Sequence, residues 1–212
     1  MTGMLSPDLL LQAYRQGIFP MAETRDAQDV FWVQPRFRGI LPLDSFHVSR
    51  SLRKTLRRGH LTASADCAFA QVVQGCANRP ETWINPPIYD VYQALYAQGD
   101  AHSIEVWQSD ALVGGVYGVT VGTAFFGESM FSTVTDASKV ALTCAIERLN
   151  RQGFTLFDTQ FITPHLASLG GIEIARAEYE DRLAKALTRT ADFGSPGTID
   201  LDQLAQSITQ TS

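Results

Sequence analysis

The chain has 212 residues, of which 45% are hydrophobic, and its formal net charge is −5. This composition is too hydrophobic for a disordered chain, and the length allows one large domain or two small ones. No run approaches the roughly 18 uninterrupted apolar residues of a membrane helix, and the start lacks the basic segment of a signal peptide, so we expect a cytoplasmic protein.

Helices and irregular segments are expected to alternate in the first half of the chain. The first helix, over residues 6–17, begins with Ser-Pro, which suits the N-cap and first helical positions, and it ends at a glycine. The segment over residues 18–43 is rich in proline and aromatic residues and favours short strands and loops. Apolar residues at helical spacing predict two further helices, over residues 67–77 and 87–99.

Residues 50–58 form a basic segment with the sequence RSLRKTLRR. Its five cations recur at i, i+3, i+4, i+7 and i+8, which places them on one face of a helix. A merely solvated face usually interleaves acids with bases, since like charges at i, i+4 repel each other. A face with cations alone favours a polyanionic partner held through phosphate contacts rather than base readout. The five residues are Arg50, Arg53, Lys54, Arg57 and Arg58.

The second half has a regular order of strands and helices. The expected elements are a three-stranded meander (102–108, 111–122, 123–131), a helix (136–153), a strand (154–161), a short helical segment (162–171), a strand (172–175) and a helix (177–190). Asp136 is expected to be the N-cap of the long helix. The polar tail over residues 194–212 is expected to dock loosely.

A meander followed by a helix and a parallel strand resembles the core of GNAT-type acyltransferases. We therefore expect an α+β (mixed α/β) fold, with a small N-terminal domain over residues 1–99 and a GNAT-like domain, a mixed sheet flanked by helices, over residues 100–212. The usual members cradle the pyrophosphate of acyl-CoA in a glycine-rich turn, but the corresponding segment, MFSTVTDASKVA (130–141), contains no glycine. A different activated acyl group, such as an aminoacyl-tRNA, is therefore favoured.

Nine segments closely resemble the bacterial leucyl/phenylalanyl-tRNA–protein transferases. They are AYRQGIFP (13–20), HVSRSLRK (47–54), TWI (82–84), AHSIEVW (101–107), LVGGVYG (112–118), GESMFS (127–132), ASK (137–139), DTQ (158–160) and HLASLGG (165–171). The resemblance implies transfer of Leu or Phe, with Met as a further donor to consider, from tRNA to the N-terminal Arg or Lys of acceptor proteins, marking them for the N-degron (N-end rule) pathway. It also implies that no metal or cofactor is needed.

Asp158 and Gln160 stand two residues apart in an apolar strand, so strand alternation predicts both side chains on one face. We expect Asp158 to accept a hydrogen bond from the Gln160 amide, and Gln160 to orient the attacking amine. The ester is already activated and an α-amine has a pKa of about 8, so positioning is the main requirement. The vicinal ribose hydroxyl would relay the proton. The resemblance assigns catalysis to the same pair. The alternative is a structural role, in which Asp158 caps the following segment and Gln160 is a rim residue whose hydrogen bonds are satisfied.

Glu128 lies among apolar residues in FFGESMF, and a buried carboxylate needs a partner, either a substrate cation or a structural arginine. The resemblance favours a catalytic role for it. It also implies an apolar aminoacyl pocket, although each of its residues could equally be ordinary core. The implied pocket residues are Val116, Phe125, Met130, Ala145, Leu149 and Phe157.

Tyr14 and Trp83 are candidates for stacking on the terminal adenosine of the tRNA. After GIFP the family often has Trp, whereas this chain has Met21, and Val116 and Ala145 are smaller than usual. These departures bear on how adenine is held and on the balance between donors.

Two other classes of function remain open, an acyl-CoA N-acyltransferase and a tRNA-binding protein without catalysis. The three cysteines form no C-x-x-C pair and the four histidines have no metal-ligand spacing, so free thiols and no metal are expected. We expect no membrane partner and a monomer.

Overall fold

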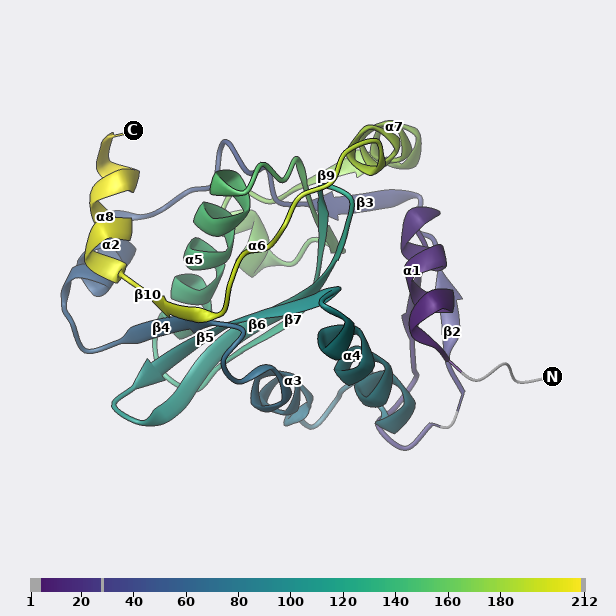
Figure 1. Ribbon diagram of the computed structural model, residues 1–212, viewed down its shortest axis with the longest axis horizontal. Helices are drawn as coiled ribbons and strands as arrows, with labels where there is room; N and C mark the ends of the chain where they lie inside the picture. Colours follow the sequence, from purple (N-terminus) through teal and green to yellow (C-terminus); the bar gives the residue numbers. More distant parts are fainter. Residues whose placement is uncertain (1–4, 28, 211–212) are drawn as a thin grey trace.

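An eight-stranded mixed sheet forms the centre of the computed structural model, which describes residues 5–27 and 29–210 (Figure 1). Its strand order is β10-β4-β5-β6-β7-β8-β3-β9, and only the β7–β8 pair is parallel among the described strands. β1 and β2 form a separate two-stranded ribbon. The strands are β1 (Phe19–Met21), β2 (Phe31–Val33), β3 (Phe37–Ile40), β4 (Thr62–Ala65), β5 (Ala101–Gln108), β6 (Ala111–Val121), β7 (Ala124–Ser132), β8 (Leu156–Gln160), β9 (Ile172–Ala175) and β10 (Gly197–Ile199).

Helices cover both faces of this sheet. They are α1 (Pro7–Arg15), α2 (Arg50–Arg57), α3 (Phe69–Ala77), α4 (Pro86–Gln98), α5 (Ala137–Arg151), α6 (Pro164–Ser168), α7 (Arg176–Leu187) and α8 (Leu201–Gln210). The predicted meander is confirmed as β5–β7, and the predicted helices are confirmed with ends that shift by a few residues. The expected fold class, a mixed sheet flanked by helices, is confirmed.

The sheet draws its strands from the whole length of the chain. β3 and β4 precede residue 99, yet β3 pairs with β8 and β9, and β4 pairs with β5. β10, which belongs to the tail, extends the sheet by pairing with β4. The predicted domain boundary falls between α4 and β5. β4 was not anticipated because its sequence, TASA, consists of small residues without the bulk typical of strands.

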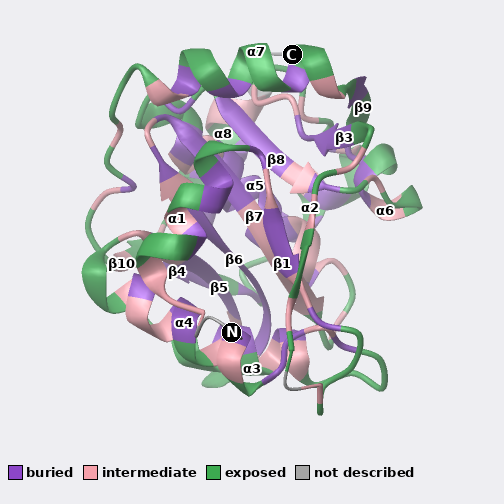
Figure 2. Ribbon diagram, turned by 90° about the vertical axis from the view of Figure 1, so that its right-hand side faces the viewer, coloured by how far each residue is buried: buried purple, intermediate pink, exposed green. Residues whose placement is uncertain are grey.

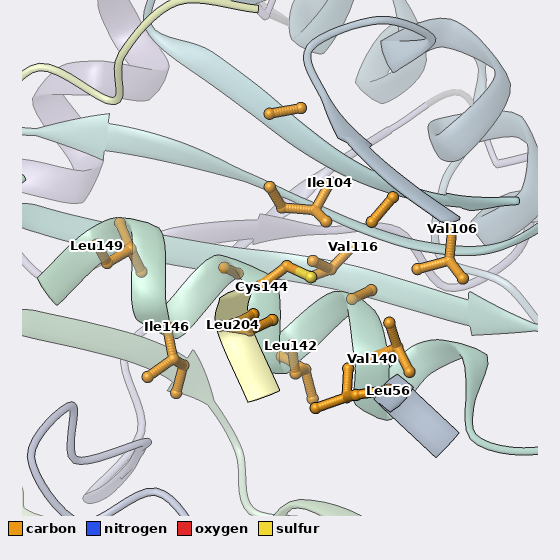
Figure 3. Close-up of a cluster of buried hydrophobic side chains, with 14 of the residues drawn as sticks. Leu56, Ile104, Val106, Val116, Val140, Leu142, Cys144, Ile146, Leu149 and Leu204 are labelled. Carbon is orange, nitrogen blue, oxygen red and sulfur yellow. The ribbon is translucent and has the colours of Figure 1, made fainter. Parts of the chain in front are cut away.

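Two apolar cores lie on the two faces of the sheet. The first includes side chains of α2, α5 and α8, such as Leu56, Cys144 and Leu204 (Figure 3). The second includes side chains of α1, α3, α4 and α7, such as Leu10 and Leu183. Figure 2 shows the central strands largely buried, whereas the outward faces of the surrounding helices are exposed. The polar groups described below therefore lie in a largely apolar interior.

Local capping explains where several helices begin. The hydroxyl of Ser6 accepts a hydrogen bond from the Leu9 amide, and Asn85 does the same for Ile88. Asp136 occupies the predicted N-cap position of α5, but its side chain makes no capping hydrogen bond. Its backbone is left-handed (φ 67°), and its carboxylate accepts instead from Lys139 Nζ (2.9 Å) and Thr55 Oγ1 (3.1 Å). The carboxylate therefore ties α5 to α2 rather than capping α5.

The expectation of a loosely docked tail is wrong. β10 pairs antiparallel with β4, and α8 buries Leu201, Leu204 and Ala205 in the first core. These residues recur at i, i+3 and i+4, the spacing of one helix face. The polar residues between them lowered the apparent hydrophobicity of the segment and obscured this face.

Candidate active site

An apolar pocket of about 310 Å³ opens where the parallel pairing of β7 and β8 stops. The paired residues run from Ala124 and Leu156 to Phe126 and Asp158, and the next residues of both strands line the pocket. The lining residues are Phe19, Pro20, Met21, Arg79, Trp83, Val116, Gly127, Glu128, Ser129, Met130, Leu142, Phe157, Thr159, Gln160, Phe161, Thr163 and Leu166. An amide, Gln160, and a carboxyl group, Glu128, thus border a pocket whose other lining residues are mostly apolar.

A bulge in β7 places Glu128 at this pocket. Tyr117 pairs with Ser129 and Gly118 pairs with Gly127, which leaves Glu128 with no opposing residue on β6. Its carboxylate accepts hydrogen bonds from Tyr14 Oη (2.7 Å) and Tyr92 Oη (2.6 Å). The partner required by a poorly solvated carboxylate is therefore a pair of tyrosines, not the arginine considered from the sequence.

Burial raises the pKa of Glu128 to about 7, against the lowering effect of the two tyrosine hydroxyls. Burial likewise raises the pKa of Tyr14 and Tyr92, so both phenols remain donors at neutral pH. The carboxyl group can therefore exchange a proton near neutrality, which suits a group beside a reacting amine.

Replacing Glu128 by Gln is expected to remove a pH-dependent loss of stability. The pKa is about 7 in the folded protein against an ordinary value of 4.5, so the folded state retains a proton that the unfolded chain loses as pH rises between these values. The free energy of unfolding of the parent protein, relative to that of the Gln variant, should therefore fall by up to about 3 kcal/mol from pH 4.5 to pH 8. Urea unfolding across this range measures it, with exposed Glu81→Gln as the control; a difference curve independent of pH would contradict the expectation.

Asp158 is fully buried and held by a buried arginine that the sequence did not reveal as a partner. Arg38 approaches it with Nε (2.9 Å to Oδ1) and Nη2 (2.6 Å to Oδ2), and Tyr179 Oη donates to Oδ2 (2.6 Å). The Arg38 guanidinium lies between the rings of Phe19 and Tyr179, 4.6 Å from each centroid, and its Nη1 donates to the Gly17 carbonyl (2.8 Å). This network pairs the Asp158 carboxylate with a buried cation and fixes its orientation.

Gln160 has a left-handed backbone (φ 58°), which breaks the expected strand alternation. Asp158 Oδ1 accepts from the backbone N–H of Gln160 (2.8 Å), so the predicted hydrogen bond from the side-chain amide to Asp158 is wrong. The surrounding carbonyls assign the orientation of that amide: with its nitrogen toward them it donates to the carbonyls of Gly127 (2.9 Å) and Thr159 (3.1 Å), whereas the opposite orientation would direct its oxygen at the same carbonyls. Gln160 consequently lines the pocket, whereas Asp158 lies behind it.

Glycine is required at position 127, where Gln160 bonds to the backbone. A Cβ added there would come within 2.4 Å of the Phe157 ring, which also lines the pocket. The glycine of GESMFS therefore permits β7 to approach Phe157 closely while its carbonyl fixes Gln160.

The structure divides the six predicted aminoacyl-pocket residues into two groups. Val116, Met130 and Phe157 line the pocket. Phe125, Ala145 and Leu149 are buried in the core beside it, where Phe125 packs edge-on against Phe157 with ring centroids 5.0 Å apart. Leu142, Thr163 and Leu166 line the pocket but were not among the predicted residues. Their contribution depends on how α5 and α6 pack, which local sequence patterns do not specify.

Tyr14 does not stack on a base in this arrangement. Its side chain is fully buried, its ring lies 4.6 Å from that of Phe126, and its hydroxyl is bonded to Glu128, so neither ring face is open to a nucleotide. The expectation is corrected: Tyr14 supports Glu128. Trp83 and Met21, by contrast, both line the pocket.

The basic segment forms α2, with the leucines buried and the cations directed outward. Leu52 and Leu56 are 1% exposed, whereas Arg50, Lys54, Arg57 and Arg58 are exposed and Arg53 is half-buried. A shallow hollow is lined by these five basic residues. The predicted basic face is thus brought together on one surface.

Arg38, Tyr92 and Tyr179 are site residues that the sequence analysis missed. The available signal for Arg38 was its position two residues before Ile40 in a short apolar strand, which puts both side chains on the same face. A charge buried on that face needs an acidic partner. Among the described residues, there is no group of three or more His, Cys, Asp or Glu side chains that could hold a metal. The search of these same residues also found no helix with the length and hydrophobicity needed to cross a membrane.

Comparison with known proteins identifies relatives over nearly the entire chain. The family model "Leucyl/phenylalanyl-tRNA protein transferase" matches residues 40–184, and the model of that family's N-terminal domain matches residues 3–36. The leucyl/phenylalanyl-tRNA–protein transferase of Ruegeria sp. (strain TM1040) is 62% identical over 98% of this chain and 99% of its own length. The corresponding protein of Cereibacter sphaeroides (strain ATCC 17025 / ATH 2.4.3) is 59% identical over 98% of both chains.

The crystal structure of FemX shares the fold, with a TM-score of 0.50 and 13% identity over 79% of this chain and 66% of that one. The fold is accordingly GNAT-like, as expected from the order of its elements. At this identity the likeness concerns the fold alone, whereas the family assignment comes from the sequence matches. The chain belongs to the leucyl/phenylalanyl-tRNA–protein transferase family of aminoacyltransferases.

Proposed function

We propose that this protein transfers Leu or Phe from aminoacyl-tRNA to the N-terminal Arg or Lys of acceptor proteins. The observation that carries the proposal is the apolar pocket bordered by Gln160 and Glu128 in a chain of this family. The new N-terminal residue would mark the acceptor for the N-degron pathway in the cytoplasm. Asp158, Gln160 and Glu128 are the proposed functional groups.

The apolar part of the pocket suits the side chain of the donor amino acid. Val116, Met130 and Phe157 would contact it, and Leu142 and Leu166 extend the same wall. An apolar pocket discriminates poorly between side chains that differ by one methylene. Leu, Phe and Met are therefore the donors to compare. Trp83, which lines the same pocket, would contact the terminal adenosine.

Gln160 would orient the attacking amine through its amide oxygen. Both hydrogens of the amide nitrogen are used by the carbonyls of Gly127 and Thr159, so the oxygen is the group that can accept from a substrate. The neutral amine attacks the ester carbon, a peptide bond forms, and the 3′-oxygen of the ribose leaves. The vicinal ribose hydroxyl relays the proton from the amine to this leaving oxygen. Positioning of this kind can supply about 7–11 kcal/mol at best.

Glu128 would interact with the ammonium form of the acceptor before attack. Its carboxylate is held by two tyrosines and borders the same pocket. Because its pKa is about 7, the carboxylate is available as the α-amine, with a pKa of about 8, becomes neutral.

A transfer assay tests the proposal directly. Purified protein is mixed with labelled Leu-, Phe- or Met-tRNA and a peptide that begins with Arg, beside the same peptide beginning with Ala. Label is expected only on the Arg peptide, from Leu- and Phe-tRNA. Tight tRNA binding without transfer from any donor would instead indicate a binding protein, and acyl transfer from acyl-CoA would indicate the other enzyme class.

Neutralising the exposed cations of α2 is expected to weaken tRNA binding without altering chemistry. Arg50→Gln and Lys54→Gln should each lower the slope of log affinity against log salt by about 1, because each removes one phosphate contact. Filter binding at several salt concentrations measures this slope. Arg15→Gln, an exposed arginine on α1, is the control; slopes identical to the parent protein for both α2 variants would exclude this surface from tRNA binding.

A further inference from the structure

A second, polar groove of about 810 Å³ adjoins the aminoacyl pocket and has no role in the function proposed above. It lies between α3 and the end of β7, and we name it the α3–β7 groove. Its lining residues are Arg25, Gln71, Gln74, Gly75, Ala77, Asn78, Arg79, Leu112, Met130, Phe131, Ser132 and Thr133. Among these described residues there is no acid, although acids outnumber bases in the chain as a whole.

Two arginines in the groove are held in place by neutral groups. Arg25 Nη2 donates to the carbonyls of Ala77 (2.7 Å) and Arg79 (2.9 Å). Arg79 donates through Nε to the Cys76 carbonyl (2.8 Å) and through Nη2 to Ser129 Oγ (3.1 Å) and the Met130 carbonyl (3.0 Å). None of these partners carries a charge, so the guanidinium groups are oriented without being neutralised by them. A preoriented cation of this kind suits phosphate.

The groove shares part of its wall with the pocket. Arg79 and Met130 line both the groove and the pocket. Thr133, which also lines the groove, begins the short loop that leads to Asp136, whose carboxylate bonds to Thr55 of α2. The groove thus adjoins the pocket proposed to hold the aminoacyl group.

We propose that the α3–β7 groove binds the unpaired 3′-terminal nucleotides of the aminoacyl-tRNA, an inference that rests on the proposed function. A single strand must connect the acceptor duplex with the ester at the pocket. Arg25 and Arg79 contact its phosphodiesters, and the amides of Gln71, Gln74 and Asn78 contact sugars and base edges. An acceptor that begins with Arg or Lys fits this groove poorly, because its cation would face two arginines.

The test introduces one acid into the groove without changing side-chain shape. The variant is Gln74→Glu, since Gln74 is exposed on α3 and lines the groove. Gln12→Glu, at an exposed position on α1 outside the groove, is the matched control. Transfer is measured with three donors: Phe-tRNA, the trinucleotide CCA esterified with Phe, and Phe-adenosine, which lacks a phosphodiester. Gln74→Glu is expected to raise KM about fivefold for the first two donors and to leave Phe-adenosine unchanged. Gln12→Glu should leave all three unchanged.

A second comparison separates the groove from the basic helix. Lys54→Gln should raise KM for Phe-tRNA alone, because α2 is proposed to hold the acceptor duplex, which the trinucleotide lacks. The proposal is overturned if Gln74→Glu leaves KM for the trinucleotide unchanged, or raises KM for Phe-adenosine equally. A lower KM for the Arg peptide with unchanged donor KM would assign the groove to the acceptor and also overturn it. Failure of the parent protein to transfer from any of the three donors would instead contradict the proposed function.

Discussion

Replacing Arg38 by Met is expected to lower the free energy of unfolding by about 3–5 kcal/mol. The guanidinium is 1% exposed and makes the only ion pair to Asp158 among the described residues, while Asp158 itself is 0% exposed. Removing the cation leaves a buried carboxylate with hydrogen bonds from Tyr179 and Gln160 but no opposite charge. The loss should therefore be much larger than that of an exposed arginine, and urea unfolding at neutral pH measures it.

The double variant Arg38→Met/Asp158→Asn distinguishes an uncompensated charge from a simple loss of packing. Removing both charges should recover part of the lost stability, because the remaining amide needs no counter-charge. Arg176→Met is the control, since Arg176 also bonds to backbone carbonyls but lies near the surface. A loss below about 1 kcal/mol for Arg38→Met would show that the pair contributes little.

Gln160→Ala is expected to reduce kcat for transfer by about 10²-fold, the scale expected when a reacting group is misplaced by roughly 1 Å. The amide oxygen that would orient the amine is lost, whereas the basic surface of α2 is unchanged, so the Kd for tRNA should remain the same. Single-turnover transfer from Phe-tRNA to an Arg peptide measures the chemical step separately from binding.

Gln160→Gly provides the matched variant for this experiment. The left-handed backbone at this position (φ 58°) strains alanine but not glycine. If the amide is the functional group, both variants lose activity equally, although the glycine variant is the more stable of the two. If activity follows stability, with the glycine variant active and the alanine variant impaired, Gln160 acts through its backbone and the proposed mechanism is wrong.

Features of the fold that depend on residues close together in the sequence could be predicted from the sequence. Apolar periodicity located the long helices, and the positive φ of Gly17 and Gly99 agrees with the predicted helix ends. The cations of the basic segment share one face because helical geometry alone determines that arrangement. The short segments that resemble the family also indicate Asp158, Gln160 and Glu128, although not the contacts that these residues make.

Tertiary structure alone decided how these groups are used. Arg38 and Asp158 are 120 residues apart, and Tyr14 and Glu128 are 114 apart, so no local pattern pairs them. The orientation of Gln160 depends on a carbonyl of β7 and on a left-handed backbone that breaks strand alternation. The sequence thus determined which polar residues the chain carries and which helices it forms. Packing across the sheet determined which carboxylate is neutralised and which one borders the pocket, because burial and charge pairing depend on distances between remote segments.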